Sequence, residues 1–66
     1  MKLREQIGTE LRALRQERGY STRQLAELTG LTHSHIVRIE AGRYNVGIDT
    51  IEKLFTELGA RIVIQK

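Results

Sequence analysis

The side chains best suited to chemistry in this sequence lie on one face of a short helical segment, residues 32–41. Each residue of a helix advances by about 100°, so Ile36 and Ile39 fall on the same side as Thr32 and form an inward seam. The opposite side is small and polar and carries one base, a composition that helix stability does not require. Its members are His33, Ser34, Val37, Arg38 and Ala41.

These outward side chains match groups that double-stranded DNA exposes in its major groove. The fork of Arg38 can pair with both acceptors of guanine, and Val37 can contact a thymine methyl. His33 and Ser34, at the N-terminal end of the segment, can bond base edges or phosphates. The alternative for Val37 is an ordinary exposed valine. The candidate DNA base contacts are therefore His33, Ser34, Val37 and Arg38.

Excess positive charge lies in and beside the same segment. The chain has a formal net charge of +3, and residues 12–43 contain six Arg and three Glu, whereas the remainder is balanced. Such a local excess is typical of a protein that binds a polyanion, although an ordinary solvated surface is the alternative. Tyr44 can instead cover the core, and Arg12 and Arg23 are weaker candidates. The candidate phosphate contacts are Thr22, Arg23, Thr32, Arg43, Tyr44 and Asn45.

The pair His33 and His35 does not form a metal or catalytic site. Residues two apart on a helix point about 200° away from each other, so the two rings cannot ligate one ion. Ser34 diverges from His35 and lacks a base held by a third group. The chain contains no cysteine, which excludes thiolate sites and fits a reducing compartment. We predict a protein without enzymatic activity, metal or cofactor, located in the cytoplasm because its charged N-terminus is no signal peptide.

Two short helices joined by a tight turn must position these side chains. Ser21 opens the first with a capping box to Gln24. Gly30 sits where a helix end favours the left-handed conformation, Thr32 caps the second helix and Gly42 closes it. The inward stripe of the first is Leu25, Ala26 and Leu28. A buried helix pair with such an outer face is how a helix-turn-helix presents a recognition helix to the major groove.

Two further helices complete a predicted all-α fold. Apolar residues at intervals of three and four predict one helix over residues 2–18 and another over residues 48–58. The first stripe is Leu3, Ile7, Leu11 and Leu14, and the second is Ile48, Ile51, Leu54, Phe55 and Leu58. A chain of 66 residues can form only one small domain. We assign residues 1–59 to a helix-turn-helix DNA-binding domain.

The residues 19–43 resemble a known family. Their pattern, G-Y-S-x-x-x-L-A-x-x-x-G-L-T-x-S-x-I-x-R-I-E-x-G-R, is similar to that of the Xre or Cro-type repressors, whose phage members include the lambda repressor and Cro. The similarity extends to residues 11–15 and 50–54, and so covers nearly the whole chain. It implies a compact, lambda-repressor-like domain of four to five helices.

The resemblance also implies a structural ion pair and shows two departures. Arg15 and Glu40 occupy positions where the family has a partly shielded pair that ties the first helix to the third. Thr22 stands where the family often has Gln, which puts one DNA contact in question. Val46-Gly47 replaces a common Pro-Ser and leaves the weaker glycine cap.

The pattern changes from helix to strand at residues 60–65. Three β-branched aliphatics in succession predict a strand, and no other segment predicts a partner for it. Because an unpaired apolar edge is an aggregation hazard, we predict antiparallel pairing with the same strand of a second copy. Residues 60–66 are thus a dimerisation segment, in which alternate side chains face a floor of Ile51, Phe55 and Leu58. The inward residues are Ala60, Ile62 and Ile64, and the outward ones are Arg61, Val63 and Gln65.

Two function classes fit these observations. The first is a sequence-specific regulator, a repressor that binds a palindromic operator as a homodimer. The second is an antitoxin, because residues 56–66 resemble the helix-then-strand ending of HipB-like antitoxins, which repress their own operon and bind a HipA-type kinase toxin. A third possibility is that the chain is the N-terminal domain of a longer repressor.

Overall fold

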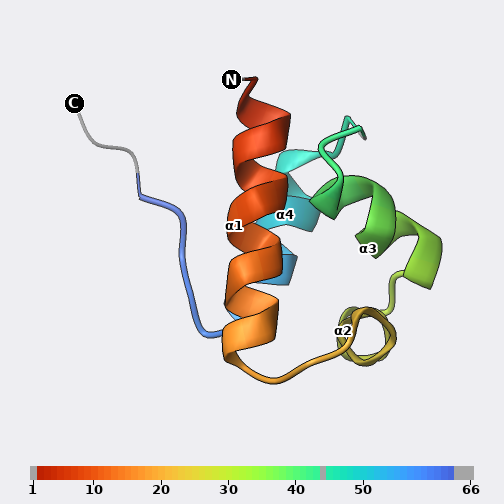
Figure 1. Ribbon diagram of the computed structural model, residues 1–66. Helices are drawn as coiled ribbons and strands as arrows, with labels where there is room; N and C mark the ends of the chain where they lie inside the picture. Colours follow the sequence, from red (N-terminus) through yellow and green to blue (C-terminus); the bar gives the residue numbers. More distant parts are fainter. Residues whose placement is uncertain (1, 44, 64–66) are drawn as a thin grey trace.

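Four helices in the order predicted from the sequence make up the described part of the chain. A computed structural model describes residues 2–43 and 45–63. The helices are α1 (Leu3–Glu17), α2 (Thr22–Thr29), α3 (His33–Glu40) and α4 (Ile48–Glu57) (Figure 1). α1 packs on α3, and α2 packs on both α3 and α4. The predicted all-α, helix-turn-helix fold is confirmed, and each helix end lies within two residues of its predicted position.

Caps at both ends of α2 and at the start of α3 fix where these two short helices begin and end. The Ser21 hydroxyl accepts from the Gln24 backbone N–H at 3.1 Å, and the Gln24 side chain accepts from the Ser21 N–H at 2.8 Å. Gly30 ends α2 at φ 75°, a left-handed conformation that costs a residue with a Cβ. The Thr32 hydroxyl then accepts from the His35 N–H at 3.2 Å. Local hydrogen bonds therefore fix the turn between the two helices.

The core gathers one aliphatic stripe from each helix. Its fully buried members are Leu11, Leu25, Ile36, Leu54 and Leu58. Three residues assigned to inward stripes are exposed instead, which corrects that part of the prediction: Leu3, Leu28 and Ile48. Leu3 and Ile48 begin their helices, beyond the reach of the neighbouring helices. Periodicity gives the direction in which a side chain points, but it does not say whether another element lies there.

A glycine allows α1 and α3 to approach each other. Gly8 is buried in the middle of α1. A Cβ built on it would lie 2.3 Å from the Ile39 carbonyl oxygen and 2.8 Å from that of Glu40. Since both obstacles are backbone atoms, no rotamer change relieves the clash. Gly8 therefore sets the distance at which α1 supports the C-terminal end of α3.

The predicted strand is not present in the described part of the C-terminal segment. After Ala60, whose N–H donates to the Phe55 carbonyl at 2.8 Å, residues 61–63 form no strand and are exposed. The predicted alternation of inward and outward side chains is therefore not seen in the single chain. The physical reason is the one that motivated the dimer: a strand needs a partner for its backbone groups. Ile64 and Gln65 lie outside the described residues, and pairing across a dimer stays a prediction.

Candidate nucleic-acid interface

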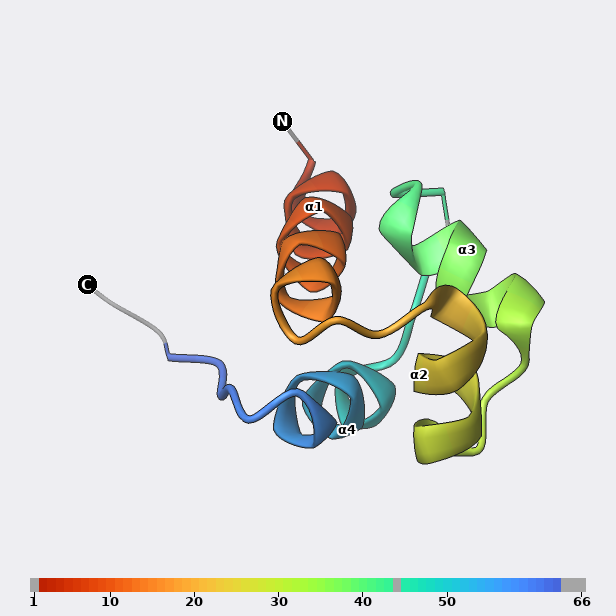
Figure 2. The ribbon, with the colours of Figure 1, turned by 60° about the horizontal axis from the view of Figure 1, so that its bottom comes forward.

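The outer face of α3 is open to solvent, while its inner face is packed. Ile36 and Ile39 are 0% and 2% exposed. On the other side Ser34 and Arg38 are exposed, and Val37 retains 45% of its accessible surface. The structure thus brings three of the four predicted base contacts together on one exposed surface, and none of the four described helices lies over it (Figure 2).

The fourth predicted base contact, His33, is held by a predicted phosphate contact. The Nε2 atom of His33 lies 2.7 Å from the Thr22 hydroxyl oxygen. Both residues are half-buried, and they are the first residues of α3 and α2. The hydrogen bond orients the imidazole and joins the N-terminal ends of the two helices. The sequence offers no signal for this contact, because the two residues are eleven positions apart in different helices.

The two helix N-termini add backbone donors to this face. The first N–H groups of a helix have no intrahelical partner, and the aligned peptide dipoles favour an anion there. Thr22 and His33 bring these ends side by side. The surface around their hydrogen bond therefore combines the Thr22 hydroxyl, the His33 imidazole and the backbone N–H groups at the starts of α2 and α3, a set suited to an anion such as phosphate.

The remaining predicted phosphate contacts are exposed where the structure describes them. Arg23 and Thr32 flank the two helix N-termini, and Arg43 and Asn45 lie in the loop after α3. Tyr44 lies outside the described residues, so the choice between phosphate contact and core cover stays open.

Arg15 and Glu40 form a bidentate ion pair between α1 and the last turn of α3. The Arg15 Nε and Nη2 atoms donate to the Glu40 carboxylate at 2.6 and 3.0 Å, and Nη1 donates to the Tyr20 carbonyl at 2.8 Å. Only 10% and 8% of the two side chains remain exposed. The hydrogen bond to Glu40 raises the pKa of Arg15 above its ordinary value, despite its burial. The pair is thus charged and fixes α3 from its C-terminal end.

Arg18 contributes to the basic excess in the sequence but has a structural contact. Its Nε donates to the Leu58 carbonyl at 2.9 Å, just after α4. This bond satisfies a carbonyl that a helix end leaves without an intrahelical partner. Sequence reasoning missed it, since it joins residues 40 positions apart. Arg18 therefore ties the C-terminal end of α1 to the C-terminal end of α4.

Within residues 2–43 and 45–63, no three His, Cys, Asp or Glu side chains lie close enough together to hold a metal ion. None of the described helices combines the length and apolar character needed to cross a membrane.

Comparisons with known proteins agree with this fold and surface. A family model described as a helix-turn-helix domain matches residues 6–61. The HTH-type transcriptional regulator PuuR of Escherichia coli K12 is 44% identical over 52 residues, which are 79% of this chain and 28% of that regulator. The immunity repressor of Bacillus phage phi105 is 36% identical over 56 residues, 85% of this chain and 39% of the repressor. The chain therefore spans less than half the length of these relatives.

A solved structure is similar over nearly its whole length. The restriction-modification controller protein C.AhdI of Aeromonas hydrophila superposes with a TM-score of 0.83 at 38% identity, covering 88% of both chains. The two chains are thus similar in fold and in length.

Proposed function

Because this chain belongs to the Xre/Cro-type helix-turn-helix family, we propose that it is a transcriptional repressor that binds a palindromic operator in double-stranded DNA as a homodimer, in the cytoplasm. The observation that carries the proposal is the outer face of α3, which is exposed, uncharged except for Arg38, and flanked by the donors around Thr22 and His33. A stability argument does not explain this face, whereas major-groove reading does.

In the proposed complex the side chains divide into reading and positioning groups. Arg38 reads guanine with two hydrogen bonds, Val37 contacts a thymine methyl, and Ser34 bonds a base edge. Thr22 holds His33 against the DNA, so one pair serves both a base edge and a phosphate. Arg43 and Asn45 contact the backbone and carry no sequence information. Two copies related by a two-fold axis read half-sites about 34 Å apart.

Footprinting on the DNA around the chain's own gene tests the proposal. We expect protection of two inverted half-sites about one helical turn apart, and reduced expression of a reporter whose promoter overlaps them. If the dimer neutralises roughly 6–10 phosphates, affinity falls by about 10³ to 10⁵ between about 50 and 200 mM salt. An affinity for DNA that does not change with salt concentration, or the absence of binding at low salt, would refute DNA recognition. Protection without increased or reduced expression would refute only a regulatory role.

The antitoxin alternative stays a hypothesis about a further partner. It shares the DNA chemistry of the repressor and adds a HipA-type kinase toxin. A gene for such a kinase next to this one, followed by co-purification of the two products, would support it. Independent expression of this chain with no adjacent kinase gene would contradict it.

A further inference from the structure

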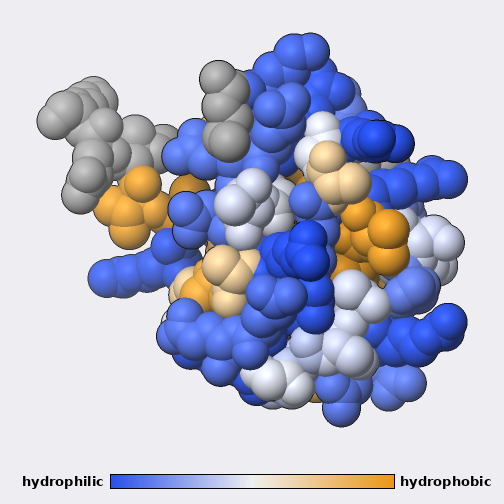
Figure 3. Space-filling view, viewed as in Figure 1, coloured by the Kyte–Doolittle hydropathy of each residue, from blue (hydrophilic) through white to orange (hydrophobic). Residues whose placement is uncertain are grey.

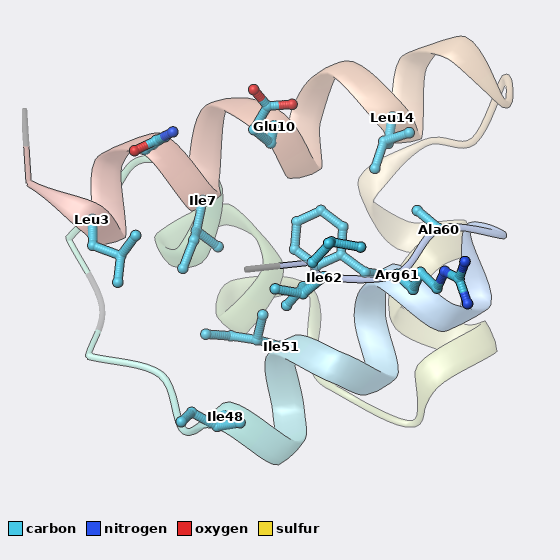
Figure 4. Close-up of a pocket in the computed structure, with 12 residues that line it drawn as sticks. Leu3, Ile7, Glu10, Leu14, Ile48, Ile51, Ala60, Arg61 and Ile62 are labelled. Carbon is cyan, nitrogen blue, oxygen red and sulfur yellow. The ribbon is translucent and has the colours of Figure 1, made fainter. Parts of the chain in front are cut away.

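An apolar groove runs between α1 and α4 on the side of the molecule away from α3. It has a volume of about 700 Å³ and is closed at one edge by residues 60–63. Figure 4 shows Leu3 and Ile7 of α1 opposite Ile48 and Ile51 of α4, with Ile62 between them. In both ribbon views the C-terminal segment and α3 lie on opposite sides of α1 (Figures 1 and 2).

The side chains at the groove are more exposed than their types favour. Ile48 is 81% exposed, Leu3 70%, Val63 65% and Ile62 55%. Singly exposed aliphatics are ordinary, but four that line one groove form a contiguous patch of the kind that marks an interaction site. On the surface, hydrophobic atoms gather at the edge formed by the C-terminal segment, beside a largely hydrophilic face (Figure 3). Within residues 2–43 and 45–63, these four side chains remain exposed and no other side chain covers them.

The charged residues at the groove favour a second copy of the chain as the molecule that covers it. Glu10 on α1 and Arg61 on the C-terminal segment both line it and are both exposed. Neither takes part in an ion pair within the described residues. In a two-fold dimer the same patch of each copy packs against that patch of the other. Every contact between two different residues therefore occurs twice, once in each direction. A surface with one acid and one base, each without an ion pair in the described part of the chain, is complementary to itself. A strongly acidic or strongly basic partner would match only one of the two.

We propose that this groove is the interface between two copies of the chain. Leu3, Ile48 and Ile62 of each copy pack against the same patch of the other, and Glu10 pairs with Arg61 of the second copy at both rims. The inference rests on the homodimer of the proposed function and names its surface and its charged contacts. Because α3 lies on the other side of α1, this dimer leaves both reading faces open to DNA.

Sedimentation equilibrium of the whole 66-residue chain and its variants tests the interface. Glu10→Arg and Arg61→Glu each place like charges at both rims, and like-charge juxtaposition opposes association. We expect each to raise the dimer dissociation constant by on the order of tenfold, and the double variant to return it to within about threefold of the original, because the pair is restored with its signs exchanged. Ile48→Glu should raise the constant by on the order of 100-fold, since it puts a charge in the desolvated centre.

A control separates this effect from a change of net charge. Glu57→Arg makes the same charge change as Glu10→Arg at an exposed position of α4 outside the groove, and should leave the dissociation constant unchanged. Thermal unfolding of each variant confirms that it is folded, which is expected because the substituted side chains are exposed in the single chain.

The possible outcomes distinguish this inference from the proposed function. A dimer whose dissociation constant is the same in Glu10→Arg, Arg61→Glu and Ile48→Glu overturns the groove as the interface and leaves the homodimer standing. A chain that sediments as a monomer overturns both the groove and the homodimer. DNA binding by the chain is tested independently, by its salt dependence. If both single variants raise the dimer dissociation constant and the double variant does not bring it back, the Glu10–Arg61 contact is wrong.

Discussion

The hydrogen bond between Thr22 and His33 changes the interpretation of two residues. In the sequence, Thr22 departs from the family pattern and puts a DNA contact in question, while His33 is one of several polar residues on a helix. In the structure their side chains meet at 2.7 Å. The departure at Thr22 therefore comes with a contact to the reading helix, and the two residues have to be considered as one unit.

Replacing Arg38 and Arg43 separately should distinguish base reading from backbone positioning. Arg38→Ala is expected to weaken binding to the operator by about 1–3 kcal/mol and to relax the preference at one base position. Arg43→Ala should weaken binding to every duplex alike and reduce the salt dependence by about one phosphate contact. Binding isotherms on the operator and on single-base variants of it check both expectations. Indistinguishable profiles for the two variants would contradict the assigned roles.

A double-mutant cycle measures the coupling of Arg15 and Glu40. Loss of one partner leaves the other charge largely buried and uncompensated, a change that costs about 3–5 kcal/mol for a fully buried pair. We expect a value towards the lower end, because some surface of both side chains remains exposed. Arg15→Met and Glu40→Gln, singly and together, are compared by denaturant unfolding.

The pH dependence follows from the pKa of Arg15. Since the fold raises that pKa, the part of the stability that is linked to the protonation of Arg15 is fully present below its ordinary pKa and is lost only as the pH rises through the raised pKa in strong alkali. Coupling of less than about 0.5 kcal/mol in the cycle would show that the contact makes no net contribution.

At the scale of the elements, capping and close approach have different origins. The ends of α2 and α3 follow from residues within four positions of each other, such as Ser21 with Gln24 and Thr32 with His35. The crossing of α1 over α3 depends instead on the absence of a side chain at Gly8. A glycine within a helical pattern is normally unfavourable by about 1 kcal/mol relative to alanine, and here tertiary packing reverses that preference.

Gly8→Ala is therefore expected to destabilise the protein despite the better helix propensity of alanine. Overpacking typically costs about 1–3 kcal/mol, and the obstacles here are backbone atoms. For a domain of this size that corresponds to a fall in Tm of about 4–8 °C per kcal/mol. Ala13→Gly is the matched control, because Ala13 is exposed on α1 and the reverse change there measures helix propensity alone, about 1 kcal/mol. A Gly8→Ala variant that is more stable than the original chain by a similar amount would show that α1 and α3 can move apart freely.

In the proposed dimer, the C-terminal segment links the assembly of the whole molecule to DNA recognition. Residues 60–63 contribute to the groove, and residues 61–63 among them are exposed. A monomer offers one reading helix, whereas a dimer fixes two at a defined spacing. The affinity for a palindrome should therefore depend on residues that never approach DNA.

Deletion of residues 61–66 should give a folded monomer that binds DNA weakly and with little sequence preference. The truncation keeps the bond from the Ala60 N–H to the Phe55 carbonyl, so α4 retains its C-terminal end. Sedimentation and operator binding are measured on the same samples. A truncated chain that still sediments as a dimer would place the interface elsewhere.

The helices, their order and the face of α3 that is exposed to solvent could all be predicted from the sequence. Those features depend on interactions between residues close in the chain: capping residues, left-handed glycines and apolar residues at intervals of three and four. The family pattern predicts the same helices, because it consists of these same capping, glycine and apolar residues. The ion pair of Arg15 with Glu40 was implied only by the resemblance, and the structure shows its geometry.

Whether a side chain that points inward or outward has a neighbour depends on how the helices pack against one another. Leu3, Leu28 and Ile48 follow the helical period but lie where no other helix reaches them. Thr22 with His33, Arg18 with Leu58, and Gly8 with the end of α3 join segments distant in the chain. Such contacts leave no periodic or local pattern, since they depend on the angles and distances at which whole helices pack. For the same reason the single chain leaves residues 61–63 without a strand: the backbone partner that a strand requires belongs to another segment or another molecule.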